Sequence, residues 1–369
     1  MKNRLPLCLV AFLLCSCLYQ GAIAAETADK LISKVSLSRP SFNPTQKGKV
    51  ELKYHLSRDA KVTVNVYDPD WALIRTIAKE SAQKTGENTM TWKGVDDKGN
   101  IVPDEGYFFT IIAEDESGKK EIYDPTIFSG GVTHDIVDVK IDREEHTIDY
   151  RMPEMGRVMI RVGIQGGPLM VTIVDWLPRV KGAVTEYWNG KDKDGLVDLL
   201  NTQKAKMIVT YFSLPENSVI TYGNRNTTYR SYKKKQGKAV TLKPDRGILT
   251  ENISHHYKLP RTIDYAPELT VDFSNTVEGK DNDVVTLKGK TIVKVDLNKD
   301  DKEVFKNQQF EIAFFLDQTF YAEDEVGYTP FNWVWDLSQV EPGEHILTVN
   351  ISGFRDQVGV LSRKVRIIK

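Results

Sequence analysis

The sequence predicts an all-β chain of antiparallel β-sandwiches in series, and three observations carry this prediction. Apolar and polar residues alternate with a period of two over short segments such as 50–56 and 60–66, as in half-buried strands. Turn residues separate these segments, and no long stretch shows a helical period. The length of 369 residues corresponds to about two to three domains.

A repeated segment divides the first two thirds of the chain. Residues 92–99 return 96 positions later as residues 188–195, with Trp, Gly, Asp and Gly at identical spacing. The same offset aligns the strand-like segments 52–56 and 62–66 with 148–152 and 158–162. A shared offset over several strands indicates a duplicated domain. We expect its two cores to contain the equivalent aromatic residues Trp92 and Trp188, and Tyr54 and Tyr150.

Composition and cysteine usage exclude several classes of protein. Lys and Arg number 50 against 51 Asp and Glu, so the net charge gives no sign of a nucleic-acid-binding protein. Cys8, Cys15 and Cys17 are the three cysteines of the chain. The remainder therefore has no disulfide, Cys metal site or thiol nucleophile, and we expect no cofactor and no metal site.

The N-terminus has the pattern of a secretory signal. Lys2 and Arg4 precede an apolar run at residues 5–18, which is short for a permanent membrane helix. Small residues before Ala25 favour a signal peptide over residues 1–24. Alternatively, residues 14–17 resemble a bacterial lipobox in which Cys17 is lipidated. Either outcome exports the mature protein to the periplasm, the cell surface or the medium.

Residues 30–130 form the first predicted module. Phe-Asn-Pro at 42–44, the strand pair 50–66 and the Trp turn at 92–99 are followed by Val-Pro at 102–103 and Gly-Tyr at 106–107. This order resembles the Ig-like domain of the flagellar hook-capping protein, FlgD. The resemblance implies an Ig-like or FnIII-like β-sandwich of a kind found in secreted bacterial proteins, usually as a non-catalytic appendage. Residues 131–225 are expected to form the duplicate module.

A basic segment follows, at residues 226–262. Its densest part carries the residues Arg230, Tyr232, Lys233, Lys234, Lys235 and Lys238. Interleaved tyrosines and cations are typical of a surface that contacts an anionic polymer or membrane phosphates. The other interpretation is a solvated linker or a long hairpin loop.

Residues 263–369 form the third predicted module. A strand at 310–317, the Pro-Phe-x-x-x-Trp-Asp segment at 330–336 and Gly-x-His at 343–345 resemble bacterial Ig-like domains. Of Trp333 and Trp335, we expect one to pack inside the sandwich and the other to face outward.

Acidic residues between Asp296 and Asp301 resemble the opening of a calcium loop. Such a loop needs Gly at its sixth position and Glu at its twelfth, where this chain has Asp301 and Asn307. An acidic hairpin turn is the alternative.

No catalytic motif emerges from the sequence. It contains no Gly-x-Ser-x-Gly, and no recognisable motif pairs its carboxylates. We therefore expect a non-catalytic envelope protein, a scaffold, adhesin or assembly accessory that meets another envelope or extracellular protein through sheet edges and loops. The alternative functions are binding of a carbohydrate, another anionic polymer or a membrane surface, or a role as accessory subunit of a secreted enzyme.

Overall fold

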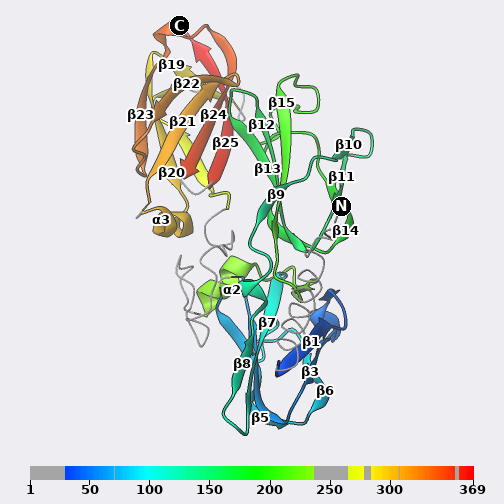
Figure 1. Ribbon diagram of the computed structural model, residues 1–369. Helices are drawn as coiled ribbons and strands as arrows, with labels where there is room; N and C mark the ends of the chain where they lie inside the picture. The colour runs from blue at the N-terminus through cyan, green and yellow to red at the C-terminus, as the bar shows by residue number, and fades with distance from the viewer. Residues whose placement is uncertain (1–29, 70, 237–264, 278–283, 307, 354–356) are drawn as a thin grey trace, which may run out of the picture.

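The computed structural model describes residues 30–69, 71–236, 265–277, 284–306, 308–353 and 357–369, which form three β-sandwiches (Figure 1). No helix within these ranges is long and apolar enough to cross a membrane. The predicted signal segment with Cys17, and Lys238 of the basic segment, lie outside the described residues.

The first sandwich packs a sheet of order β1-β3-β6 against a sheet of order β2-β16-β7-β4-β5, in which β8 also pairs with β7. Its elements are β1 (Ile32–Leu37), β2 (Ser41–Phe42), η1 (Pro44–Gln46), β3 (Val50–Leu56), β4 (Ala60–Tyr67), β5 (Leu73–Gln83), β6 (Gly86–Trp92), β7 (Gly106–Asp115), β8 (Lys120–Tyr123) and η2 (Pro125–Ile127). Alternate residues of β3 and β4 point into the core, as the period-two pattern predicts.

The second sandwich repeats this arrangement, with sheets of order β10-β11-β14 and β13-β12-β15-β9. Its strands are β9 (Thr133–Asp135), β10 (Lys140–Asp142), β11 (Thr147–Met152), β12 (Gly156–Ile164), β13 (Leu169–Arg179), β14 (Gly182–Tyr187) and β15 (Ala205–Ser213). The predicted duplication is confirmed, because β11 to β14 follow β3 to β6 at the predicted offset and pair in the same order.

The predicted boundary at residue 225 is wrong. The strand β16 (Val219–Thr221) follows the second sandwich in sequence but pairs with β7 and β2 of the first. All three residues of β16 are buried there. The chain therefore returns to the first module before it continues to the third.

The third sandwich packs a sheet of order β17-β20-β23 against one of order β18-β19-β25-β24-β21-β22. Its elements are β17 (Leu269–Phe273), β18 (Thr276–Val277), β19 (Val285–Lys288), β20 (Lys290–Leu297), α3 (Lys299–Phe305), β21 (Phe310–Leu316), β22 (Thr319–Asp324), β23 (Phe331–Asp336), η4 (Leu337–Gln339), β24 (Gly343–Gly353) and β25 (Val358–Ile368).

Trp333 and Trp335 lie on the same face of β23, contrary to the expectation. Their rings stack with centroids 5.3 Å apart, and Trp335 is fully buried. Val334 between them is 61% exposed. The expectation failed because side chains two positions apart in a strand share a face.

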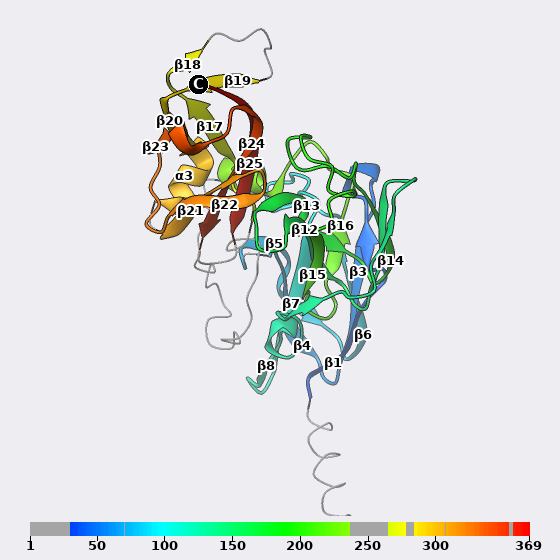
Figure 2. The same cartoon turned by 90° about the horizontal axis from the view of Figure 1, so that it is seen from above.

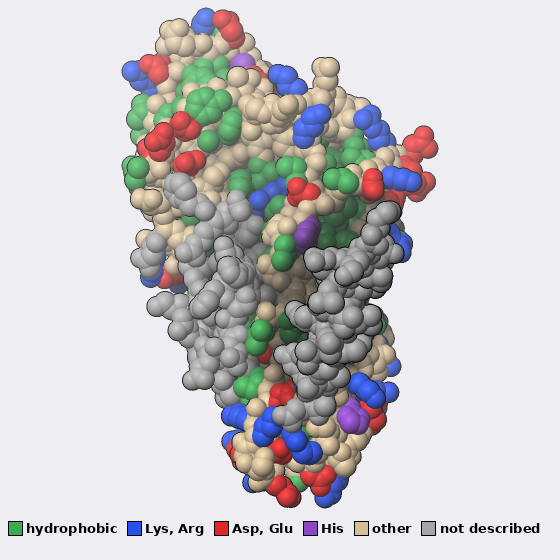
Figure 3. Space-filling model, in the orientation of Figure 1, with side chains coloured by type: hydrophobic (Ala, Val, Ile, Leu, Met, Phe, Trp, Pro, Cys, Tyr) green, Lys and Arg blue, Asp and Glu red, His purple; other side chains and the backbone are tan. Residues whose placement is uncertain are grey.

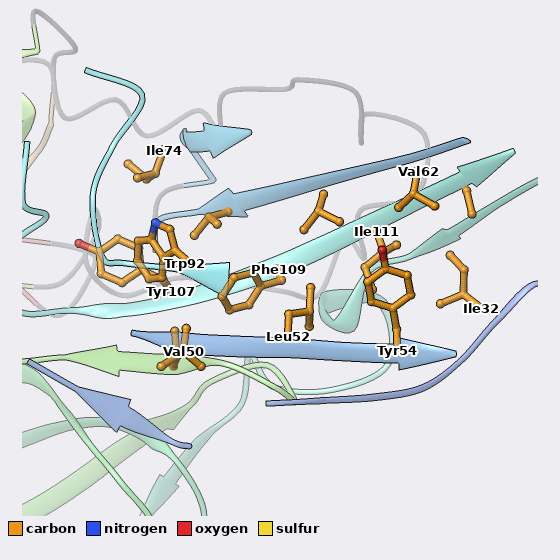
Figure 4. Packing of buried hydrophobic residues seen from close by; sticks show 14 of the residues in the cluster. Ile32, Val50, Leu52, Tyr54, Val62, Ile74, Trp92, Tyr107, Phe109 and Ile111 are labelled. Atoms are coloured by element: carbon orange, nitrogen blue, oxygen red, sulfur yellow. The ribbon is translucent and has the colours of Figure 1, made fainter. Parts of the chain in front are cut away.

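The four expected core aromatics are all buried, but their surroundings differ between the copies. Trp92 is 1% exposed and makes edge-to-face contacts with Tyr107 and Phe109 (Figure 4) and also with Phe42. Trp188 is 9% exposed. Each indole N–H donates to a backbone oxygen three residues ahead, at 2.9 Å to Val95 and 2.8 Å to Lys191. Tyr54 and Tyr150 lie in the same two cores.

The turn after each tryptophan explains why the Gly-x-Asp pattern recurs. Gly94 and Gly190 have φ of +69° and +77°, which favours glycine, and a Cβ there would meet Pro44 and Leu200 respectively. The carboxylate of Asp96 accepts from the backbone N–H groups of Lys98 and Asn100, and that of Asp192 accepts from two backbone N–H groups in its own turn. These carboxylates hold the turns together.

Buried contacts join the first two sandwiches. Arg157 of β12 donates through Nε to the carboxylate of Glu105 at 2.8 Å, and both side chains are 0% exposed. Beside this pair, an aromatic cluster combines residues of both modules: Tyr67, Trp71 and Phe108 with Met159, Trp176 and Phe212.

The third sandwich lies against the second, with β25 beside β13 (Figure 2). The side chain of Asn350 exchanges two hydrogen bonds with the backbone of Leu169, at 2.8 and 3.0 Å. Asp194 accepts from the backbone N–H of Ser362 at 2.6 Å, and Lys193 donates to the carbonyl of Val360 at 3.0 Å.

Candidate functional site

Residues 229–235 of the basic segment form a short helix, α2 (Tyr229–Lys235), between the first and third modules (Figure 1). Thr228 caps it by accepting from the N–H of Ser231, and three lysines occupy its last turn. Cations near a helix C-terminus interact favourably with the helix dipole. The prediction of a solvated linker is therefore wrong for residues 229–235.

One side of α2 is buried against the first module. The ammonium of Lys233 lies 2.9 Å from the carboxylate of Asp68, with side chains 4% and 0% exposed. Tyr232, 5% exposed, donates from its hydroxyl to Asp96 at 3.0 Å. Since Asp96 also holds the Trp92 turn together, α2 contacts the turn that recurs after Trp188 in the second module.

This contact affects two titrating groups. Burial acts to raise the pKa of Asp96, but hydrogen bonds from Asn100, Tyr232 and Lys98 outweigh it and hold that pKa below its ordinary value. Burial raises the pKa of Tyr232, and the neighbouring Asp96 carboxylate raises it further. The tyrosine therefore remains a donor and Asp96 an ionised acceptor at neutral pH.

The other side of α2 reaches α3 of the third module. Arg230 forms an ion pair with Asp301, whose side chain is 0% exposed. The guanidinium of Arg230 also lies 4.8 Å from the centre of the Tyr265 ring. Lys234 pairs with Asp300 at 2.8 Å, with both side chains exposed. The helix thus bridges two modules through four different cationic or polar side chains.

The structure therefore divides the six residues predicted to contact an anion. Tyr232 and Lys233 are buried, so neither can face an external polymer. Arg230 and Lys234 already pair with carboxylates of the third module. Lys235 is exposed, and Lys238 lies outside the described residues. The basic character of this stretch serves contacts between modules, which sequence alone could not distinguish from a binding surface.

The acidic residues considered as a calcium loop have other partners. Asn298 caps α3 by accepting from the N–H of Asp301. Asp296 pairs with Lys302 at 2.8 Å, and Asp301 also accepts from the N–H of Glu268 at 2.8 Å. No group of three or more His, Cys, Asp or Glu able to hold a metal occurs among the described residues.

A concave surface that the sequence analysis did not predict lies in the second module. A cavity of about 580 Å³ opens beside Trp188 and is lined by Val139, Ile141, Leu199, Leu200 and Met207. Asn201, Thr202, Gln203 and Arg143 form its polar part. A second hollow of about 460 Å³ shares Val139, Ile141 and Met207 with the first. Hydrophobic side chains are visible on this face of the second module (Figure 3).

Comparisons with known proteins match the first module to one family. Residues 40–117 match the FlgD Ig-like domain, which confirms the resemblance expected for that module. The FlgD structure from P. aeruginosa is 24% identical, covers 26% of this chain and 73% of that chain, and has a TM-score of 0.21. No curated protein matches the chain.

Two other solved structures cover most of the chain at low similarity. Fibronectin(III)-like modules of Clostridium thermocellum CbhA are 10% identical, cover 90% of this chain and 94% of that chain, and have a TM-score of 0.19. A structure from a 1.5-MDa bacterial ice-binding adhesin is 12% identical, covers 92% and 98%, and has a TM-score of 0.18.

Proposed function

We propose that this chain is an exported, non-catalytic scaffold or assembly accessory of the cell envelope, which acts by contacting another envelope protein. The observation that carries the proposal is the locking of three sandwiches into one unit. Domains in one chain move relative to one another by default unless their interface is extensive. Here a buried ion pair and an aromatic cluster span the junction of the first two sandwiches. The third sandwich is joined to them by ion pairs from α2 and by hydrogen bonds between Asn350 and Leu169. Such a body holds its exposed edges at fixed spacing, as a scaffold requires.

The predicted signal segment and the FlgD-type module support an exported location and a role in protein contacts. The carboxylates of Asp96 and Asp301 support a non-catalytic role, because they hold a turn and an ion pair. Asp96 accepts from its own turn and from α2, and Asp301 is committed to Arg230 and Glu268.

The alternative of carbohydrate or anionic-polymer binding receives less support. The anion-binding version relied on six residues, of which Tyr232 and Lys233 are buried. Arg230 and Lys234 pair with carboxylates of the third module. Sugar-binding surfaces present free aromatic faces, whereas Trp333 of the third module stacks on Phe314 at 4.2 Å and on Trp335. These rings serve the sandwich itself.

Fractionation of a bacterial host that expresses the full chain tests the proposal. We expect the mature chain outside the cytoplasm, beginning at Ala25, with Cys17→Ser leaving its mass and location unchanged. Cross-linking followed by affinity capture from envelope extract should then recover a specific protein partner. Full-length protein retained in the cytoplasm, or capture of envelope polysaccharide without any protein, would contradict the proposal.

A further inference from the structure

The edge of β15 in the second module is incompletely covered. On one side β15 pairs with β12 along its whole length. On its other side β9 covers only Thr210–Phe212, and the backbone N–H of Ile136 donates to the oxygen of Val209. Among the described residues no strand pairs with 205–208 on that side.

The open backbone groups lie next to the cavity. In an antiparallel ladder, residues two apart direct their N–H and C=O groups to the same side. Because the oxygen of Val209 faces β9, the backbone groups of Met207 face the open side. The Met207 side chain lines both hollows of the second module. The open backbone of Met207 therefore borders a hollow that has both apolar and polar side chains in its lining.

The first module shows the same edge occupied. Val66 of β4 pairs with Phe109 as Val162 of β12 pairs with Met207, so the counterpart of Ala205 is Tyr107. In the first module Tyr107 pairs with Val219 of β16, which is fully buried. The second copy has no equivalent of β16 among its described strands.

The covering strands of the first module also fill the space over its tryptophan. β2 pairs in parallel with β16 and places Phe42 against Trp92, with ring centroids 5.7 Å apart. β2 lies in the connection 38–49 between β1 and β3. The equivalent connection in the second module is the short turn 143–146. Beside Trp188 there is accordingly a cavity where Trp92 has a phenylalanine.

We infer that the open edge of β15 receives an extended segment of a partner protein, which pairs antiparallel with residues 205–208 and seats an apolar side chain beside Trp188. Strand addition to a free sheet edge combines backbone hydrogen bonds with pockets for alternate side chains. The occupant is a short β-branched segment like Val-Ile-Thr of β16, since that is what covers the equivalent edge. The inference rests on the proposed function and names the surface through which the scaffold meets its partner.

A peptide with the sequence of residues 216–223, which contains β16, is the probe. When the folded mature chain is added to the labelled peptide, the fluorescence anisotropy of the peptide should rise to saturation. Binding should also change the intrinsic tryptophan fluorescence of the chain, and this change should be lost in Trp188→Phe. The same peptide with N-methylated backbone amides keeps its side chains but cannot pair, so it should bind at least tenfold more weakly.

Protein variants localise the binding. Ala205→Asp places a carboxylate in the cavity and should weaken peptide binding at least tenfold, whereas Ile208→Ser changes an exposed side chain on the opposite face of β15 and should not. Unchanged melting temperatures show that both variants are folded. If Ala205→Asp unfolds, Met207→Glu replaces it, because Met207 is only partly buried and lines the same cavity.

The inference would be overturned by no saturable binding at millimolar peptide, by equal binding of the N-methylated peptide, or by self-association of the chain that Ala205→Asp abolishes. The last would make a second copy the occupant. If wild type and Ala205→Asp capture the same envelope partner equally well, the edge of β15 is not the binding surface, while the scaffold function stands. Failure of export would instead contradict the scaffold function without affecting peptide binding.

Discussion

Lys233 shows at the scale of one residue how tertiary neighbours decide the role of a charge. In sequence it belongs to a run of cations that reads equally well as a linker or as a binding surface. In the fold it is buried against Asp68, about 165 positions away. Nothing local to residues 229–235 encodes that partner, so sequence alone could not place this residue.

Lys233→Met should destabilise the first module strongly. The substitution keeps most of the side-chain volume but removes the ammonium from a buried carboxylate, which costs about 3–5 kcal/mol. Urea unfolding of the full chain measures the loss. The exposed Lys235→Met is the matched control and should change stability by no more than about 0.5 kcal/mol. Adding Asp68→Asn to Lys233→Met should restore much of the stability; equal losses at both lysines would refute the buried pair.

Asp96 predicts a pH dependence. Its pKa is lower in the folded chain than its ordinary value of 3.8, so its ionised form stabilises the fold above that pH. This contribution is lost as the pH falls below 3.8 and through the folded pKa. Unfolding experiments between about pH 5 and pH 3 should therefore show a steeper loss of stability in wild type than in Asp96→Asn. Parallel curves for the two proteins would count against the depressed pKa.

At the scale of elements, strands and their duplication were the most predictable part of the fold. Period-two alternation identified β3, β4, β11 and β12, and the repeated Trp turn aligned the copies. Strand β16 could not be predicted, because it pairs across more than a hundred positions with a strand of another module. Trp333 and Trp335 lie on one face of β23 because they are two positions apart, so the expectation of opposite faces is wrong. The cavity in the second module lies where the first module has β2 and β16, which have no counterparts among the described strands of the second module. No residue pattern signals this difference.

The two equivalent tryptophans should differ in their contribution to stability. Trp92→Ala should cost about 3–5 kcal/mol, because three aromatic rings pack on the indole and the space cannot collapse. Trp188→Ala should cost less, because its ring already borders a cavity and is more exposed. Denaturant unfolding monitored by circular dichroism gives both losses. A larger loss at Trp188 would show that the cavity is closed in solution.

In the whole molecule, we infer that the three sandwiches behave as one body. Helix α2 contacts the first module through Tyr232 and Lys233 and the third through Arg230 and Lys234. The second module meets the first at Arg157 and the third at Leu169. The sequence predicts three modules. It does not predict the contacts between them, because such contacts leave no periodic signal.

Small-angle X-ray scattering from the monodisperse mature chain tests this claim most directly. We expect a profile that the single arrangement of Figures 1 and 2 reproduces, with a bell-shaped Kratky plot and no change in radius of gyration with salt. Arg230→Ala combined with Lys234→Ala should enlarge the radius of gyration by releasing α2 from the third module. A wild-type profile that requires an ensemble of extended, independently oriented modules would show that the three sandwiches do not form one body.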